Sequence, residues 1–347
     1  MSIKNSFYSD NSSGAHPKIL QSIQKVNEDF VIPYGKDPYT EQAKIQFEKN
    51  FGTNIAIYFV SNGTSANVLS IKAMTKSYHS VLCTEESHIY TAECGAIENF
   101  CGTKIIPMKT NDGKLNEEII EEQIMNVDNV HKNQPSVVSI TQPTELGTVY
   151  SIDEIKRIAN LTKKHGMLLH MDGARLANAA EYLGVSFKEL TKDVGVDVLS
   201  FGGTKNGLLM GEAIVIFNLK LAKDFKYIQK QGLQLMSKMR FLSTQFDCVL
   251  KNELWLENAR QANQMARLLE KEINQISDFK VILPVQSNII LIKTTKKNIK
   301  FLQRRYSFLV RSFQKDTFCI RFVTSFLTKK SDVIDLINYI KQANFKK

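Results

Sequence analysis

The chain has 347 residues, of which 43% are hydrophobic and 23% charged, and its formal net charge is +10. This composition is typical of an ordinary globular protein, and roughly 150 residues per domain predicts about two domains. No run approaches the roughly 20 apolar residues that a membrane-spanning helix needs, and the polar N-terminal segment has no apolar stretch of signal-peptide length. We therefore exclude a collagen, a membrane protein, a disulfide miniprotein and a disordered chain.

The cysteine pattern indicates a reducing compartment. The number of cysteines, five, is odd, and no two form a CxxC pair. Together with the lack of a secretory segment, this favours free thiols in the cytoplasm. Three of the five lie within nineteen residues, but no histidine stands at ligand spacing beside them. We therefore expect no metal site.

The positive charge is concentrated near the C-terminus. Residues 291–347 carry 14 Lys and Arg against 3 Asp, and the remaining 290 residues sum to −1. A basic region can bind nucleic acid, but here the basic residues are dispersed among Ile, Leu, Phe and Val. We expect a lysine-rich surface facing solvent, and neither a nucleic-acid nor a membrane partner.

In chain order, short apolar runs bounded by polar residues or glycine predict strands, and longer amphipathic runs predict helices. The expected strands cover residues 55–60, 80–84, 104–108, 136–141, 167–172, 196–201 and 212–217. The expected helices cover residues 65–76, 116–125, 151–165 and 187–192. This alternation predicts an α/β fold, with a large domain whose mostly parallel seven-stranded sheet is covered by helices.

A smaller α+β domain is expected at the C-terminus. Residues 250–275 form a long helical pattern, and strands at 280–285, 287–294 and 317–324 precede a closing helix at 331–342. We place an N-terminal segment at residues 1–20, the large domain at 21–248 and the small domain at 249–347.

Four segments place chemistry-bearing residues just after expected strands, where functional groups collect in open α/β sheets. The first, residues 61–67, reads Ser-Asn-Gly-Thr-Ser-Ala-Asn and opens a helix. Gly63 lets the backbone approach an anion, and Thr64 adds a hydroxyl donor at the positive end of the helix dipole. Alone, such a segment is typical of a turn followed by a helix cap.

The next two segments carry an aspartate and a lysine. Asp172 ends an apolar strand and therefore needs a positive partner. In a structural interpretation, this partner is Arg175, which lies one helical turn further on. In a functional interpretation, the partner is a protonated ring nitrogen of a cofactor. Lys205 lies in a glycine-rich loop after a strand. It is either a reactive amine or an ordinary exposed lysine.

His88 follows the strand that ends at residue 84 and completes the set. It is either a core or capping histidine, or an imidazole that stacks on a flat ring. The order and spacing of the phosphate-type loop, the histidine, the strand-end aspartate and the loop lysine together predict a single site.

This set resembles a fold-type I pyridoxal phosphate enzyme, and more closely the threonine aldolase family. The resemblance covers nearly the whole chain, from Tyr-Ser-Asp-Asn at 8–11 and Pro-Tyr-Gly-Lys-Asp at 33–37 to Ile-Arg-Phe-Val-Thr at 320–324. It includes Ser-Asn-Gly-Thr at 61–64, Ser-His at 87–88, Gly-Thr-Lys at 203–205 and Met-Arg at 239–240. The Asp-Gly-Ala-Arg element at 172–175 and the late Arg-Phe-Val-Thr are its most specific parts.

The resemblance implies roles toward the cofactor, pyridoxal 5'-phosphate. Lys205 would form a Schiff base with it, Asp172 would pair with the pyridine nitrogen, and His88 would stack on the ring. Gly63, Thr64 and Thr204 would donate hydrogen bonds to its phosphate, and Arg175 would lie near the oxygen on its ring.

The resemblance also implies how the substrate is held. Ser9, from the N-terminal segment, and Arg321 would bind the carboxylate of an amino acid, with Arg175 nearby, and a bidentate arginine fixes the substrate plane. Tyr34 and Arg240 are similar to residues that reach a site across a subunit boundary. A homo-oligomer, most simply a homotetramer built as a dimer of dimers, is therefore implied.

Many relatives carry His-Asn-Gly where this chain has Glu145-Leu146-Gly147, and that histidine is associated with the β-hydroxyl of the substrate. Glu145 is therefore a candidate acceptor or base in its place. The candidates for the general base are Glu145, His88 or a water held between them.

The expected reaction is the cleavage of L-threonine or L-allo-threonine to glycine and acetaldehyde by a cytoplasmic lyase. One alternative is a pyridoxal phosphate-dependent β-eliminating lyase or transferase that acts on another amino acid. The other is a non-catalytic scaffold or RNA-binding protein that uses the basic C-terminal region.

Overall fold

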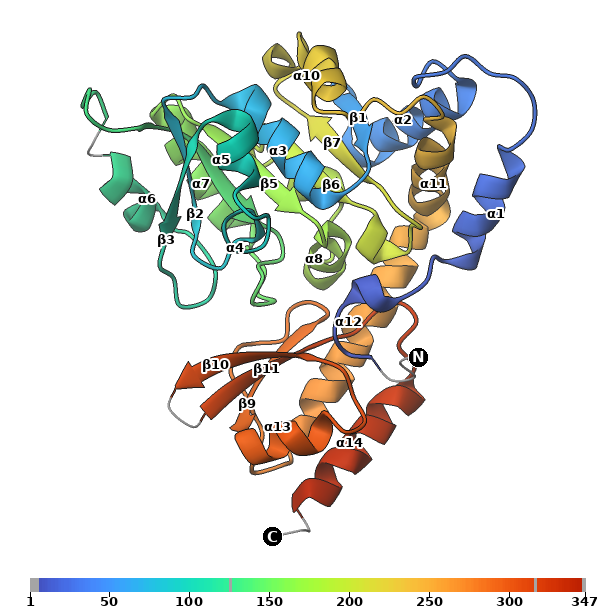
Figure 1. Ribbon diagram of the computed structural model, residues 1–347, viewed down its shortest axis with the longest axis vertical. Helices are drawn as coiled ribbons and strands as arrows, with labels where there is room; N and C mark the ends of the chain where they lie inside the picture. The colour runs from blue at the N-terminus through green and yellow to red at the C-terminus, as the bar shows by residue number, and fades with distance from the viewer. Residues whose placement is uncertain (1–5, 125–126, 315–316, 345–347) are drawn as a thin grey trace.

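The computed structural model describes residues 6–124, 127–314 and 317–344. A large α/β body carries a seven-stranded sheet, and a smaller lobe with its own sheet lies beside it (Figure 1). The long helix α12 (Leu254–Ile273) runs from the first body into the second. The N-terminal segment crosses between the two, and its short helix η1 (Asp10–Ser12) lies where they meet.

The large sheet confirms the predicted fold class. Its spatial order is β1-β7-β6-β5-β4-β2-β3, in which only β7 is antiparallel to its neighbours. The strands are β1 (Ala56–Val60), β2 (His79–Thr84), β3 (Lys104–Met108), β4 (Gln134–Thr141), β5 (Leu168–Gly173), β6 (Val198–Gly202) and β7 (Glu212–Ile216). All seven match the predicted runs to within two residues at either end.

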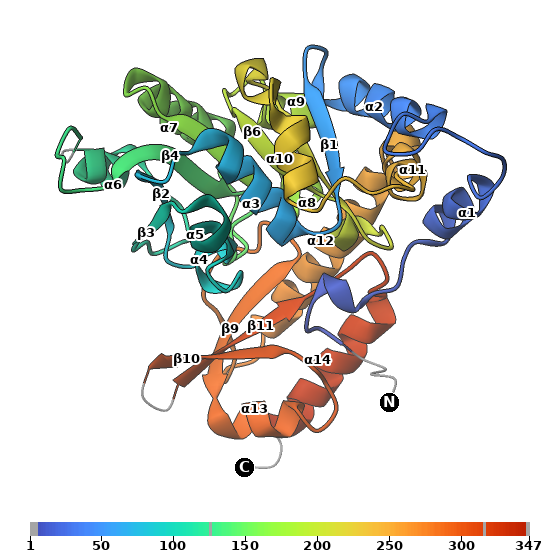
Figure 2. The ribbon, with the colours of Figure 1, turned by 45° about the horizontal axis from the view of Figure 1, so that its top comes forward.

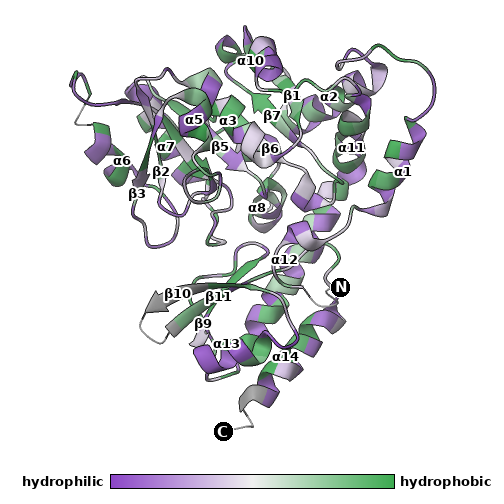
Figure 3. Ribbon diagram, in the orientation of Figure 1, coloured by the Kyte–Doolittle hydropathy of each residue, from purple (hydrophilic) through white to green (hydrophobic). Residues whose placement is uncertain are grey.

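Helices cover both faces of this sheet and bury two separate apolar cores. Figure 2 shows α3 (Gly63–Met74), α5 (Ala96–Cys101) and α10 (Phe225–Gln231) in front of the strands. The opposite face packs against α2 (Pro38–Phe51), α7 (Ile152–Lys164), α8 (Leu176–Leu183), α9 (Phe187–Leu190), α11 (Arg240–Leu250) and the start of α12. The central strands are hydrophobic and the outer helices carry the polar residues (Figure 3), as a sheet buried on both faces requires.

The C-terminal lobe is a four-stranded antiparallel sheet with the order β10-β11-β9-β8. Its elements are β8 (Lys280–Val281), β9 (Ile289–Thr295), α13 (Lys296–Leu302), β10 (Leu309–Gln314), β11 (Thr317–Val323) and α14 (Lys330–Asn344). Phe7 is buried in the apolar core of this lobe, and its backbone pairs with Ser307 and Val323. The N-terminal segment is thereby fixed to the lobe immediately before residues 9 and 10.

Two sequence predictions need correction. The predicted helix 250–275 begins only at Leu254, because Asn252 and Glu253 adopt left-handed backbone angles, with φ of 57° and 56°. The predicted strand 280–285 ends at Val281, and Pro284, which has no N–H to donate, follows. The remaining helices are α1 (Pro17–Lys25), α4 (His88–Thr91) and α6 (Glu117–Ile124).

No helix within the described ranges combines the length and the apolar character that crossing a membrane would require.

Candidate active site

The predicted site residues meet at the carboxyl ends of the central strands. Asp172 lies near the end of β5, and Lys205 belongs to a short 3-10 turn, η2 (Thr204–Asn206), just beyond β6. The loop that starts α3 follows β1, and Glu145 follows β4. Four segments that are far apart in the sequence therefore converge at one edge of the sheet, as the topology of a parallel sheet dictates.

Asp10 ties the N-terminal segment to both bodies. Its carboxylate is 1% exposed and accepts two hydrogen bonds from Arg175, from Nε at 2.6 Å and from Nη2 at 2.9 Å. Asn288, which immediately precedes β9, donates a third at 3.1 Å. Burial by itself would raise the pKa of Asp10, but the charge and hydrogen bonds of Arg175 outweigh burial and the pKa is lowered. Arg175 therefore pairs with Asp10 and not with Asp172, which corrects the structural interpretation of the sequence.

Lys205 is buried among charged groups. Burial lowers the pKa of its amine below the ordinary lysine value, and the positive charge of Arg175 lowers it further. Three carboxyl groups act in the opposite direction: Asp10, Asp172 and Glu212. A lowered pKa increases the fraction of neutral amine near neutral pH, and the neutral amine is the nucleophilic form.

A chain of hydrogen bonds links Asp172 to His88. Asn67 donates from Nδ2 to Oδ2 of Asp172 at 2.9 Å and to Oε1 of Glu93 at 2.8 Å. The same Oε1 lies 2.8 Å from Nδ1 of His88, and the other oxygen of Asp172 accepts from the amide of Ala174. The hydrogen bond to Glu93 raises the pKa of His88. These hydrogen bonds hold the side chains of Asp172 and His88 in fixed orientations.

Glu145 lies against the backbone of His88. Its Oε1 accepts from the amide of His88 at 2.7 Å and from the hydroxyl of Thr141 at 2.9 Å. Its Oε2 is buried and has no hydrogen-bond partner among the residues that the structure describes. Burial, together with the charge of Asp172, raises the pKa of Glu145 to about 7. A carboxyl group with such a pKa exchanges a proton readily near neutral pH.

The first turn of α3 is open. Asn62 caps this twelve-residue helix by accepting from the amide of Ser65 at 2.9 Å. A Cβ added at Gly63 would meet no atom within 4 Å, so an anion has unobstructed access to the N–H groups beside Thr64. Thr204 stands at the start of the lysine turn, and its Oγ1 accepts from the amide of Gly211.

These residues fit pyridoxal phosphate. The cofactor needs an amine to attach to, a carboxylate for its ring nitrogen and an anion site for its phosphate. Lys205, Asp172 and the open turn at Gly63 provide the three groups. The side chain of His88 is 42% exposed, which leaves one face of the imidazole available to a ring.

Two predicted carboxylate-binding residues lie on different parts of the fold, Ser9 on the N-terminal segment beside Asp10 and Arg321 on the C-terminal lobe. The hydroxyl of Ser9 lies 3.3 Å from Oδ1 of Asp10 and caps η1 by accepting from the amide of Asn11. Arg321 lies half-buried on β11, opposite Leu291 of β9.

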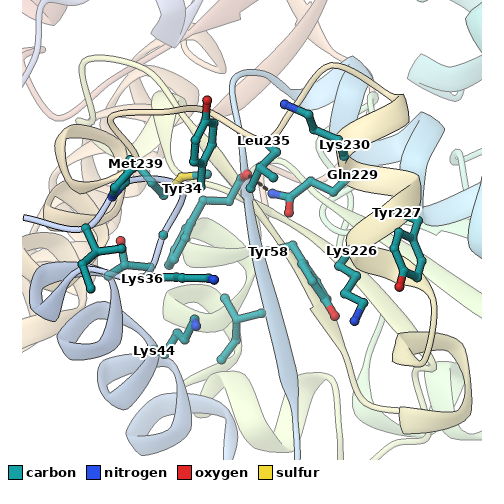
Figure 4. A pocket seen from close by; sticks show the side chains of 16 residues that line it. Tyr34, Lys36, Lys44, Tyr58, Lys226, Tyr227, Gln229, Lys230, Leu235 and Met239 are labelled. Atoms are coloured by element: carbon teal, nitrogen blue, oxygen red, sulfur yellow. Dashed lines mark hydrogen bonds between the residues drawn. The ribbon is translucent and has the colours of Figure 1, made fainter.

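Tyr34 and Arg240 do not join Lys205 within the chain. Tyr34 lines a cavity of about 830 Å³ beside β1, whose walls also carry four lysines, Lys36, Lys44, Lys226 and Lys230 (Figure 4). Arg240 donates to the carbonyl oxygens of residues 28 and 29. None of the residues that line the cavity belongs to the cluster around Lys205.

Sequence reasoning assigned no role to five buried polar residues of the cluster: Asp10, Asn67, Glu93, Glu212 and Asn288. Asn67 falls on the inner face of α3 and Glu93 comes five residues after His88, so both were near motifs already identified. Glu212 is an acidic residue at the start of an apolar strand, which is itself a signal of a buried partner. Asn288 offered no such signal.

Comparisons with known proteins agree with the fold. A family model for beta-eliminating lyases matches residues 6–296. A low specificity L-threonine aldolase of Pseudomonas sp. is 42% identical over 300 residues, covering 86% of this chain and 87% of the relative. One of Pseudomonas aeruginosa is 43% identical with the same coverage. The structure of Leishmania major threonine aldolase matches with a TM-score of 0.92 and 28% identity, over 97% of this chain and 99% of that one.

The chain therefore has the fold of a pyridoxal phosphate-dependent lyase. It belongs to the beta-eliminating lyase family, and within it to the group of the low specificity L-threonine aldolases. Membership of an enzyme family that covers nearly the whole chain leaves the non-catalytic scaffold without support.

Proposed function

We propose that this protein cleaves L-threonine, L-allo-threonine and related β-hydroxy amino acids to glycine and an aldehyde. Lys205 holds pyridoxal phosphate, which supplies an electron sink for the electron pair released at Cα of the substrate. Asp172, Thr204 and the first turn of α3 hold the cofactor at its ring nitrogen and phosphate. His88 covers one face of its ring.

The substrate carboxylate is bound by Ser9 and Arg321, with Arg175 beside them. Arg175 is already oriented by its two hydrogen bonds to Asp10, so its remaining N–H groups point in a fixed direction. Binding in this manner would fix the plane of the substrate before the Cα–Cβ bond breaks.

Glu145 is the base that this geometry supports best. It removes the proton of the β-hydroxyl as the Cα–Cβ bond breaks, so the aldehyde leaves, and a proton delivered to Cα then yields glycine. Its buried and unpartnered Oε2, combined with a pKa of about 7, is the observation that carries the proposal. Most buried polar atoms have a hydrogen-bond partner, so an oxygen without one is available to a substrate hydroxyl.

A product assay tests the proposal. The purified enzyme loaded with pyridoxal phosphate is given L-threonine, and glycine, acetaldehyde, 2-oxobutyrate and ammonia are measured together. Glycine and acetaldehyde in equal amounts are expected. In Glu145→Gln we expect the rate to fall by about 10²–10⁴-fold, the usual contribution of a general base, while Thr141→Val serves as a control that removes only one donor to Glu145.

A β-elimination is the second candidate, because the matching family model is that of beta-eliminating lyases. It uses the same Lys205 and Asp172 but yields 2-oxobutyrate and ammonia from L-threonine. Those two products in place of glycine would establish it.

We also propose a homotetramer in the cytoplasm, in which each site is completed by another subunit. Tyr34 and the exposed Phe30 and Ile32 lie on one segment beside the cavity at β1, and large exposed apolar side chains of this kind mark contact surfaces. Light scattering on the parent and on Phe30→Ser measures the oligomeric state. A monomer with full activity would refute the shared site.

A further inference from the structure

Glu212 lies between the two strand ends that lead into the site. It is the first residue of β7 and pairs with Val60, the last residue of β1, and with Gly202, the last residue of β6. The anion-binding loop follows β1, and the lysine turn follows β6. Since β7 is the antiparallel strand of the sheet, its first residue falls at the edge where its parallel neighbours end. Glu212 is only 8% exposed there.

The carboxyl group of Glu212 contacts the backbone that carries Lys205. Its Oε2 accepts from the amide of Gly203 at 2.6 Å, and Thr204 forms a hydrogen bond with it through its side chain. Glu212 therefore binds the two residues that immediately precede Lys205.

Tight packing fixes this arrangement. A Cβ added at Gly203 would come within 2.5 Å of Leu208 and 2.8 Å of the carbonyl oxygen of Gly211. Gly211, which immediately precedes Glu212, has a φ of +126° that a residue with a side chain rarely adopts. The lysine turn therefore cannot shift relative to Glu212 without a steric conflict.

Glu212 differs from the other carboxyl groups that face Lys205. Asp10 is bound by Arg175, and Asp172 accepts from Asn67 and Ala174, whereas Glu212 accepts from the backbone of the lysine turn itself. Burial raises the pKa of Glu212 to about 7, so its charge changes near neutral pH. The remaining charged group that acts on the amine is Arg175.

We propose that Glu212 is a positioning residue for Lys205. It holds the backbone of Gly203 and Thr204, from which Lys205 continues, and the charge of its carboxyl group favours the protonated form of the nitrogen that holds the cofactor. The inference rests on the proposed function, because it assigns the cofactor to Lys205.

The test is a pH titration of the loaded enzyme. The absorbance of lysine-bound pyridoxal phosphate depends on whether its nitrogen is protonated, and we measure the midpoint pH of that change in the parent, in Glu212→Gln and in a control, Glu181→Gln. Glu181 is also a mostly buried carboxylate, but its partners are Asn263 and Arg267. Thermal unfolding of all three proteins separates a change in folding from a change in protonation.

In Glu212→Gln we expect the midpoint to fall by about half a pH unit or more, because a negative charge that favours the protonated nitrogen is gone. The control should keep the parent's midpoint. A midpoint in Glu212→Gln equal to the parent's overturns the proposal. If Glu212→Gln does not fold, Glu212→Asp is titrated instead; its shorter side chain withdraws the charge, so a smaller downward shift is expected and an unchanged midpoint overturns the proposal.

Failure of the proposed function gives a different result. A parent protein that does not attach pyridoxal phosphate to Lys205 shows no such absorbance at any pH. An unchanged midpoint in a fully loaded Glu212→Gln contradicts only the role of Glu212.

Discussion

Replacing Glu145 with glutamine should make the protein more stable at alkaline pH while removing most of its activity. The pKa of Glu145 rises from 4.5 to about 7 in the fold. Below pH 4.5 the group is neutral in both the folded and the unfolded chain. As the pH rises above 4.5 the unfolded chain ionises first, so folding stability is lost until the pH passes about 7. A difference of about 2.5 pKa units, at 1.36 kcal/mol per unit, corresponds to about 3 kcal/mol.

Urea unfolding of the cofactor-free parent and of Glu145→Gln, measured in parallel from pH 5 to pH 8, isolates this effect. Between these limits we expect the parent to lose about 2.5 kcal/mol relative to the variant. At any single pH, the difference in unfolding free energy between the two proteins also includes the effect of the amide that Gln places at the unpartnered Oε2 position. The change of this difference with pH is therefore the informative quantity. If the unfolding free energies of the two proteins change in parallel with pH, the raised pKa of the buried Glu145 is refuted. Its role as a base that ionises near neutral pH is then refuted as well.

Three further predictions concern residues that hold the site. Asp10→Asn leaves the guanidinium of Arg175 without its carboxylate, and breaking a buried pair of this kind should cost about 3 kcal/mol of unfolding free energy; an unchanged melting temperature would contradict it. Glu93→Gln should lower the pKa of His88, measured by NMR titration of the imidazole, because its charged hydrogen-bond acceptor is lost; a pKa equal to the parent's would count against the link. His170 is buried and its pKa is lowered to about 4, so the parent should lose about 3 kcal/mol of stability relative to His170→Gln as the pH falls from 7 to 4. Equal losses in the two proteins would argue against a neutral His170 in the fold.

The sequence is most informative where a local pattern determines the structure. Each strand of the large sheet is a short apolar run bounded by glycine or polar residues, so all seven were predictable. The antiparallel direction of β7 was not, because the apolar run that follows Glu212 reads the same in either direction. Among the described residues, eight helices were not predicted: α1, α2, α4, α5, α8, α10, α11 and α13. The four residues of α4 are too few to show a helical period, whereas α2 and α11 are long enough and were missed nonetheless.

The chemistry of the site was predictable only in part, for a physical reason. Lys205, Asp172 and His88 follow strands whose ends must meet, so their convergence follows from the topology. Their hydrogen-bond partners come from distant parts of the chain: Asp10 contacts residues 165 and 278 positions away. Spacing in the sequence suggested Asp172 as the partner of Arg175, whereas the N-terminal segment supplies the carboxylate. Such a pairing depends on how the lobe and the segment pack, which no local pattern encodes.

The central claim is that Lys205 holds pyridoxal phosphate, and one measurement tests it most directly. The parent and Lys205→Ala are each incubated with pyridoxal phosphate, reduced with borohydride, and mapped by mass spectrometry, with the visible spectrum recorded before reduction. We predict a yellow parent protein with the cofactor fixed on Lys205, and a Lys205→Ala protein that carries no covalent cofactor and cleaves no L-threonine. A colourless parent, or a cofactor fixed on another lysine with activity retained in Lys205→Ala, would contradict the account.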